Sequence, residues 1–143
     1  MAIYSLRRRG VLTTTGAANE EVRTAATDKP FVMELHIFLA AATASTYGIG
    51  RPAAIGVTPT TPVTVLQEDP GDPAGTVTTA LAWGTAPTAP VDFFRAIGLP
   101  AVIGTGIIWS FPRGLRIAIS SSIVFWNLAT NANAVDNVVV VDE

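Results

Sequence analysis

The chain has 143 residues and a net charge of −2, so it has the length of one domain and lacks the basic excess of nucleic-acid binders. It contains no cysteine, which excludes disulfide bonds, zinc–thiolate centres and thiol nucleophiles. Only 14% of the residues are charged, against about 25% in average soluble domains, whereas 49% are hydrophobic.

So apolar a chain needs either a membrane segment or a partner that covers its surface. The longest apolar stretch, residues 31–44, is interrupted by Glu34 and His36 and is shorter than the roughly 20 residues that a transmembrane helix needs. The composition therefore predicts an apolar surface that other protein covers, in a homo-oligomer or a larger assembly.

Residues 1–18 are predicted to form an N-terminal arm or a first strand, and residues 19–143 the main domain. The only basic run, Arg7, Arg8 and Arg9, contains the twin arginines of an export signal, but no continuous hydrophobic region follows it, so we expect no export. The run fits a contact with an acidic protein surface, a contact with phosphates or a solvated segment. We take the three arginines as the candidate protein-contact residues.

The first strong element is predicted over residues 31–43. Its side chains alternate with period two, which predicts a strand with one face formed by Phe31, Met33, Leu35, Ile37 and Leu39. A helix that starts at Pro30 is the alternative, because leucine, methionine and glutamate are good helix formers. The length of the alternation favours the strand.

The rest of the chain consists of short apolar runs between clusters of glycine, proline, threonine and asparagine. Residues 47–57 fit an edge strand, a bulged strand or a loop, and residues 91–99 fit a short strand or one helical turn. Pro112–Gly114 is predicted to be the turn of a hairpin. The uncharged run Val138–Val141 has to pair in a sheet or with a neighbour, because a free edge of this kind aggregates. Further strands are predicted over residues 61–67, 76–83, 104–111, 115–119, 121–128 and 137–141.

This pattern of short strands, with 12 glycines, 10 prolines and no long helical periodicity, predicts an all-β fold. The uneven loop lengths favour an antiparallel β-sandwich, jelly-roll-like or Ig-like, with an extended N-terminal segment. No repeat of fixed period divides the domain.

His36 is the only histidine, and the alternation places it beside Glu34 on one strand face. Such a pair can act as a base, but the chain has no nucleophile-elbow motif, so we interpret the pair as structural. Glu68, Asp69 and Asp72 form an acidic loop that fits an exposed turn or a weak ion site, without the spacing of a calcium loop. We therefore expect no catalytic, cofactor-binding or metal-binding residues and a protein that is not an enzyme.

Trp83, Trp109 and Trp126 lie on different predicted strands, where aromatic side chains are usually part of the core. The alternative is a sugar-binding platform, which requires exposed aromatic rings beside polar side chains. The candidate residues for such a glycan contact are Trp126, Asn127, Asn131 and Asn133.

Two segments resemble a group of small virion proteins encoded by tailed bacteriophages. They are LAWGTAPTAPVDFFRAIGLPAVIGTGIIWSFPRGLRIAISSSIVFWNLAT, residues 81–130, and ATASTYGIGRPAAIGVTP, residues 42–59. The resemblance implies a compact β-sandwich attached to a capsid or tail, commonly as a symmetric oligomer. It carries over no functional residue, because the shared motifs are hydrophobic strand patterns.

Composition and resemblance together predict a capsid decoration or cement protein that binds the assembled shell as an oligomer, with a trimer as the favoured state. Its expected partners are the major capsid protein or other virion proteins, with no nucleic acid and no membrane. Its expected place is the virion, assembled in the host cytoplasm. The alternative function is a tail or fibre component with a receptor- or glycan-binding β-sandwich tip.

Overall fold

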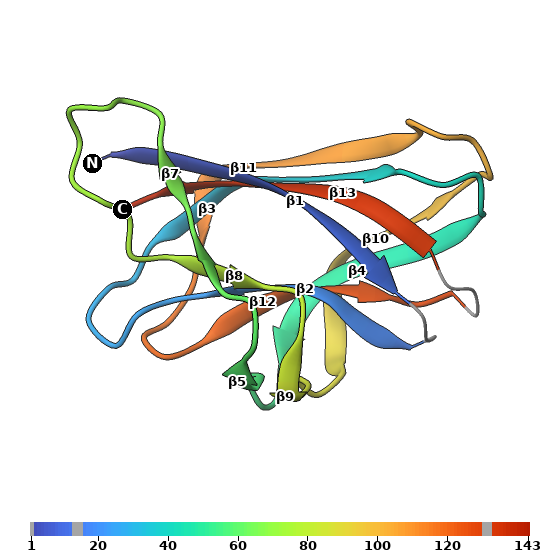
Figure 1. Cartoon of the computed structure of the whole chain (residues 1–143), viewed down its shortest axis with the longest axis horizontal. Coiled ribbons are helices and arrows are strands. Elements are labelled where there is room, and N and C mark those ends of the chain that lie inside the picture. Colours follow the sequence, from blue (N-terminus) through green and yellow to red (C-terminus); the bar gives the residue numbers. More distant parts are fainter. Residues whose placement is uncertain (1, 13–15, 130–132) are drawn as a thin grey trace.

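β-Branched and aromatic runs between glycine and proline clusters fold as strands along the whole chain. The computed structural model describes residues 2–12, 16–129 and 133–143. These residues form two antiparallel sheets packed face to face, which confirms the predicted antiparallel β-sandwich. Figure 1 shows the two layers, with both ends of the chain at the same end of the sandwich.

Sheet A contains, in spatial order, β11 (Gly106–Arg116), β3 (Phe31–Leu39), β13 (Asn133–Asp142), β1 (Ile3–Leu12) and β7 (Leu66–Gln67). Sheet B contains β10 (Pro90–Leu99), β4 (Ser45–Pro52), β12 (Ser122–Asn127), β2 (Ala17–Arg23), β8 (Thr78–Ala80) and β6 (Val63–Thr64). A separate two-stranded pair consists of β5 (Val57–Pro59) and β9 (Trp83–Thr85).

The long strands alternate between the two sheets as the chain proceeds. β1, β3, β11 and β13 lie in sheet A, while β2, β4, β10 and β12 lie in sheet B. Only β4 and β10 are consecutive long strands of one sheet, and they pair with each other. The five short strands, β5 to β9, all belong to the segment between them.

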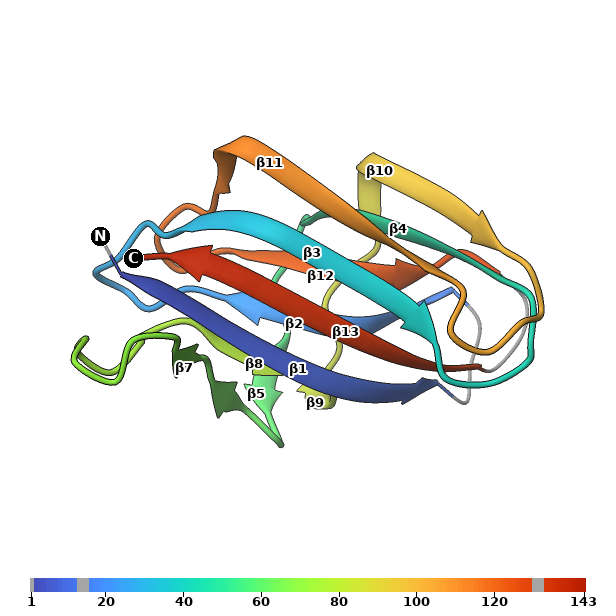
Figure 2. The same cartoon turned by 90° about the horizontal axis from the view of Figure 1, so that it is seen from above.

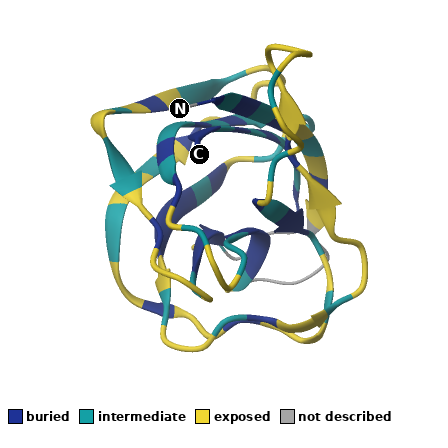
Figure 3. Ribbon diagram, turned by 90° about the vertical axis from the view of Figure 1, so that its left-hand side faces the viewer, coloured by how far each residue is buried: buried dark blue, intermediate teal, exposed yellow. Residues whose placement is uncertain are grey.

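The core lies between the sheets, where alternate residues of each strand point inward. Val22, Leu35, Ile37, Ile49 and Phe125 are among the side chains with no exposed surface. Each such side chain contributes about 1.5–3 kcal/mol of transfer free energy when it is fully buried. In Figure 3, which views the sandwich from one end, exposed residues gather in the loops and along the outside.

The N-terminal segment is a strand, so the alternative of a detached arm is wrong for residues 3–12. β1 pairs with β13 along its whole length and with β7 at Tyr4 and Ser5. Just before it, the backbone N–H of Ala2 donates to the carbonyl of Glu143 at 3.0 Å. The predicted boundary between residues 18 and 19 falls inside β2, which begins at Ala17.

Residues 31–39 form a strand, as predicted, but its inner face differs from the simple alternation. The pairing of β3 with β13 shifts between Val140 and Val141, which leaves Met33 as an extra residue opposite this position. A bulge of this kind moves all residues on one of its sides to the other face. Val32 is therefore fully buried, whereas Phe31 and Met33 are only partly buried and lie outside the core.

β11 corrects the prediction of a hairpin at Pro112–Gly114. The strand continues through this segment, because residues on both sides of it pair with β3: Ser110 with Glu34, and Leu115 with Val32. The intervening residues form an irregular bulge in which Gly114 has a φ of 66°. That backbone conformation suits glycine, and the residues that indicate a turn in sequence here form a bulge on an edge strand.

Strand pairing also decides between the alternatives for residues 91–99 and for the C-terminal valine run. Residues 90–99 form strand β10 and not a helical turn. The run Val138–Val141 lies in the centre of sheet A, with β1 on one side and β3 on the other. The aggregation-prone edge that this run would present is therefore covered within the chain.

Candidate protein-binding surface

The outer face of sheet B is covered by the chain itself. Glu21 of β2 has no exposed surface, and its carboxylate accepts hydrogen bonds from the Gly56 backbone N–H at 3.0 Å, the Trp83 Nε1–H at 2.7 Å and the Ser122 hydroxyl at 2.7 Å. The Arg23 guanidinium lies 3.7 Å from the same carboxylate and donates to the Gly56 carbonyl at 2.8 Å. This buried carboxylate thus fixes the β5–β9 segment to sheet B.

The aromatic residues considered for glycan binding belong to this covered face. Trp126 is only 7% exposed and packs with Ala18 and Val124 in a cluster that Trp83 and Phe93 cover. A ring that is enclosed in this way has no face on which a sugar can stack.

The asparagines of the glycan prediction are equally enclosed where they are described. Asn127 has no exposed surface, and its Oδ1 accepts the backbone N–H of Ala129 at 2.9 Å. Asn133 is 4% exposed, and its Nδ2 donates to the Thr43 carbonyl at 2.9 Å. Asn131 lies outside the described residues. The glycan-contact prediction is therefore wrong for Trp126, Asn127 and Asn133, because their side chains pack and hydrogen-bond within the chain.

The outer face of sheet A is uncovered, and we refer to it as the open face. In Figure 2 its four long strands, β11, β3, β13 and β1, lie side by side in the layer nearest the viewer. Its exposed and partly exposed side chains come from alternate positions of these strands. They are Ile3, Ser5, Arg7, Arg9 and Val11 of β1, Asp136, Val138 and Val140 of β13, Glu34, His36 and Phe38 of β3, and Ile108 and Ser110 of β11.

The open face carries two of the three predicted contact arginines. Arg7 and Arg9 are 61% and 56% exposed, and their guanidinium groups lie 2.8 and 2.7 Å from the same Oδ2 of Asp136. Arg9 also donates from Nε to the other oxygen of this carboxylate at 2.8 Å, so its contact is bidentate. Two cations share one anion here, so the part of the open face along β1 is positively charged, while Glu34 adds a negative charge on β3.

Arg8 points to the opposite side of the strand and is not part of the open face. Its guanidinium donates to the carbonyl of Thr61 and to the carbonyl of Thr79, each at 3.0 Å. The prediction of a protein contact therefore keeps Arg7 and Arg9 as candidates and loses Arg8, because successive residues of a strand face opposite ways. Asp136 was missed, since 127 residues separate it from Arg9 and no local pattern connects them.

The Arg7 and Arg9 contacts give a pH-dependent prediction. Their hydrogen bonds and charges lower the pKa of Asp136 from 3.8 to about 2, with the Arg9 hydrogen bond as the largest cause. Asp136→Asn should lower the free energy of unfolding at pH 7 by about 0.2–1 kcal/mol, because water screens two guanidinium groups this exposed. A lowered pKa means that this contribution is present above about pH 4 and is lost as the pH falls through about 2.

Urea unfolding of both proteins at pH 7 and near pH 2 measures this difference. The two curves should converge at the acidic pH, and 1 M salt should reduce the gap at pH 7. A gap that widens towards acid would contradict the assigned ion pairs.

Glu34 and His36 meet on the open face, as the alternation predicts. His36 Nε2 lies 2.9 Å from Glu34 Oε2, and the Ser110 hydroxyl donates to the other carboxylate oxygen at 3.4 Å. In a hydrolase triad the histidine stands between the serine and the acid. Here the acid stands between the other two, so this geometry provides no activation of the serine.

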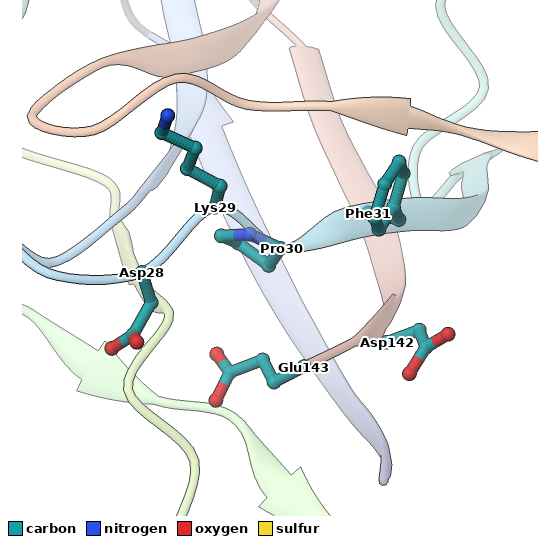
Figure 4. Close-up of a pocket in the computed structure, with 6 residues that line it drawn as sticks. All are labelled: Asp28, Lys29, Pro30, Phe31, Asp142 and Glu143. Atoms are coloured by element: carbon teal, nitrogen blue, oxygen red, sulfur yellow. The ribbon is translucent and has the colours of Figure 1, made fainter. Parts of the chain in front are cut away.

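A hollow lies at the end of the sandwich near both chain ends. Figure 4 shows its lining residues, with the Asp28 and Glu143 carboxylates on one side and the Lys29 ammonium group directed away from them. The Glu143 carboxylate already accepts the backbone N–H groups of Thr76 and Val77 at 2.8 and 2.7 Å. The Glu143 carboxylate in the wall of this hollow is therefore already bound by the loop that precedes β8.

The acidic loop after β7 is closed by its own backbone. Asp69 Oδ1 accepts the Gly71 N–H at 2.9 Å, and the Asp69 carbonyl accepts the Asp72 N–H at 3.1 Å. Within residues 2–12, 16–129 and 133–143, no three side chains of the metal-binding types gather into a possible ion site. The same residues contain no helix of the length and apolar character that crossing a bilayer requires.

The chain thus covers the outer face of sheet B and leaves the open face of sheet A exposed. The open face carries Val138, Val140 and Phe38 on its middle strands and paired arginines along β1. Among known proteins, no family model matches the chain, and the search of curated proteins finds no match.

Proposed function

We propose that this protein is a non-catalytic virion protein, a capsid decoration or cement protein whose open face binds the assembled phage shell. One observation carries the proposal: the chain covers the outer face of sheet B with its β5–β9 segment and leaves the outer face of sheet A uncovered. Apolar side chains combined with arginine are typical of protein interfaces. The resemblance of residues 81–130 to small virion proteins supplies the class of partner.

We infer that the sandwich is of the jelly-roll type. The order β11-β3-β13-β1 in one sheet and β10-β4-β12-β2 in the other supports this reading, because both sheets are built from strands that alternate along the chain. Ig-like sandwiches instead keep several pairs of consecutive strands in one sheet. Jelly rolls recur in viral capsid and lectin domains, which agrees with a virion role.

A decoration protein acts by mass action. A ligand that binds the assembled shell but not the separate coat subunits stabilises the shell by an amount that grows with its concentration. The open face presents four long neighbouring strands, which suits this task, because a surface formed across several coat subunits is broad and shallow. The exposed guanidinium groups of Arg7 and Arg9 predict an acidic patch on the shell opposite β1.

The shell contact can be tested with a single charge reversal. Arg7→Glu should weaken binding to purified, empty shells of the encoding phage by at least about tenfold, because it opposes the proposed acidic patch and keeps the Arg9 contact with Asp136. Co-sedimentation with assembled shells, with unassembled coat protein as the negative control, measures the change. Lys29→Glu is the matched control, since it makes the same charge change outside the open face.

Equal binding by wild type, Arg7→Glu and Lys29→Glu would show that the open face does not contact the shell. Fractionation of virions distinguishes the alternative role: a copy found on purified tails and not on shells would assign the protein to the tail or fibre.

A further inference from the structure

The two sides of the sandwich end in different ways. On one side both sheets end in a long strand, β10 in sheet B and β11 in sheet A. Among the described residues β10 pairs only with β4 and β11 only with β3, so each has an unpaired outer edge. On the other side the sheets end in the two-residue strands β6 and β7. We call the first the long edge and the second the short edge.

The long edge exposes part of the core. Phe94 and Ile97 of β10, with Ile107, Phe111 and Leu115 of β11, pack against the buried cluster but are only partly buried. Val91 and Ile108 beside them are 87% and 51% exposed. Isolated exposed apolar side chains are ordinary, but several of them along two unpaired strand edges mark an interaction site.

The long edge is basic. Arg51, Arg95, Arg113 and Arg116 are all exposed along it, and the acid within β10 and β11 is Asp92. The Arg51 guanidinium bridges the two sheets here, since it lies 4.9 Å from the Phe94 ring centre and donates to the Arg116 carbonyl at 2.8 Å.

The short edge is acidic and also partly apolar. Glu68, Asp69 and Asp72 follow β7 directly, and no lysine or arginine occurs between Gln67 and Trp83. Leu66 of β7 and Val63 of β6 are 61% and 40% exposed. The two edges thus match in apolar character and are opposite in charge.

We propose that the long edge of one copy binds the short edge of the next copy, so that the chain forms a closed head-to-tail ring. A two-fold dimer would place each edge against itself and oppose like charges, whereas a head-to-tail contact pairs arginines with the acidic loop. The smallest ring that one heterologous contact closes is a trimer. This contact reaches the open face only at Ile108 of β11 and uses neither Arg7 nor Arg9, so it leaves the β1 and β13 rows of the open face available for the shell.

Charge exchange between the two edges tests the ring. The long-edge variant Arg95→Glu/Arg113→Glu and the short-edge variant Glu68→Lys/Asp72→Lys should each be monomeric, because each places like charges in the contact. The four substitutions combined restore opposite charges and the original net charge, so the combined variant should form the wild-type ring. These residues are chosen because their side chains make no hydrogen bond to another strand, and circular dichroism confirms folding.

Light-scattering mass measurements on the purified proteins decide the outcome. A wild-type monomer or two-fold dimer would overturn the proposal, and so would assembly that survives either single-edge variant. Failure of the combined variant to assemble while it is folded would show that the edges do not meet. No shell is present in this experiment, so its result is separate from the shell-binding test, and Arg7→Glu should retain the ring.

Discussion

Glu21→Ala is expected to lower the free energy of unfolding by about 3–5 kcal/mol, the cost of removing one partner from a buried ionic network. The carboxylate has no exposed surface, and its loss leaves the Trp83 Nε1–H, the Gly56 N–H and the Ser122 hydroxyl without an acceptor inside the protein. Each unsatisfied buried donor costs about 1–3 kcal/mol unless water reaches it. Urea unfolding followed by far-ultraviolet circular dichroism measures the difference.

The control for this prediction is Glu34→Ala. Glu34 is the same residue type, but its side chain is 41% exposed on the open face, so we expect a loss of no more than about 1 kcal/mol. If the two variants were equally stable, Glu21 would not anchor the β5–β9 segment. Trp83→Phe keeps most of the ring packing but removes the Nε1–H donor, and it should fall between the wild type and Glu21→Ala.

Glu20→Gln is expected to stabilise the protein at pH 8 by up to about 3 kcal/mol and to have little effect near pH 4. Burial raises the pKa of Glu20 from 4.5 to about 7, an effect that nearby Asn137, Arg8 and Thr79 oppose only in part. Among the described residues neither carboxyl oxygen of Glu20 has a partner in hydrogen-bonding geometry, and neither does Oδ1 of Asn137. A protonated carboxyl group, or an amide, can donate to that oxygen.

The direction follows from proton binding. Between about pH 4.5 and 7 the unfolded chain has lost the Glu20 proton while the folded protein still holds it, so stability falls as the pH rises through this range. Above about pH 7 the full cost of a buried carboxylate is present. Thermal and urea unfolding of wild type and Glu20→Gln from pH 4 to 8 should therefore diverge with rising pH.

Glu68→Gln controls for the change in net charge in this series, since it removes one carboxylate from an exposed loop. A constant difference between wild type and Glu20→Gln across the pH range would contradict the assignment of a buried, titrating Glu20.

The fold class could be predicted because the signals for strands lie in neighbouring residues of the sequence. Period-two alternation and turn residues indicate strands, and both are present in the first strong element, residues 31–43. Neighbouring residues do not show where a bulge interrupts the alternation. The extra residue Met33 moves Val32 into the core, and the extra residue Asn19 in β2 turns Glu20 inward opposite Phe125. Bulges depend on the pairing partner, which lies far away in the chain.

The candidate surface was predictable in part. The basic run in the sequence indicated Arg7 and Arg9 as contact residues. The rule that successive strand residues face opposite ways places Arg8 on the other side of the strand. Their partner Asp136 and the covering of Trp126 by the β5–β9 segment follow only from the sheet order. A tryptophan beside asparagine looks the same in sequence whether a distant segment covers it or not.

The place of β13 bears on how the protein is made. This strand follows all the others along the chain, yet it lies between β1 and β3 in the middle of sheet A. While the nascent chain leaves the ribosome, β1 and β3 each have a strand edge whose backbone groups lack a partner. Valine-rich β13, which pairs with both edges, is synthesised after them. Sheet A therefore completes only after β13 has been synthesised, and it folds slowly, as in other domains with distant strand pairing. Until then the unpaired edges of β1 and β3 are exposed to those of other nascent chains on the same polysome.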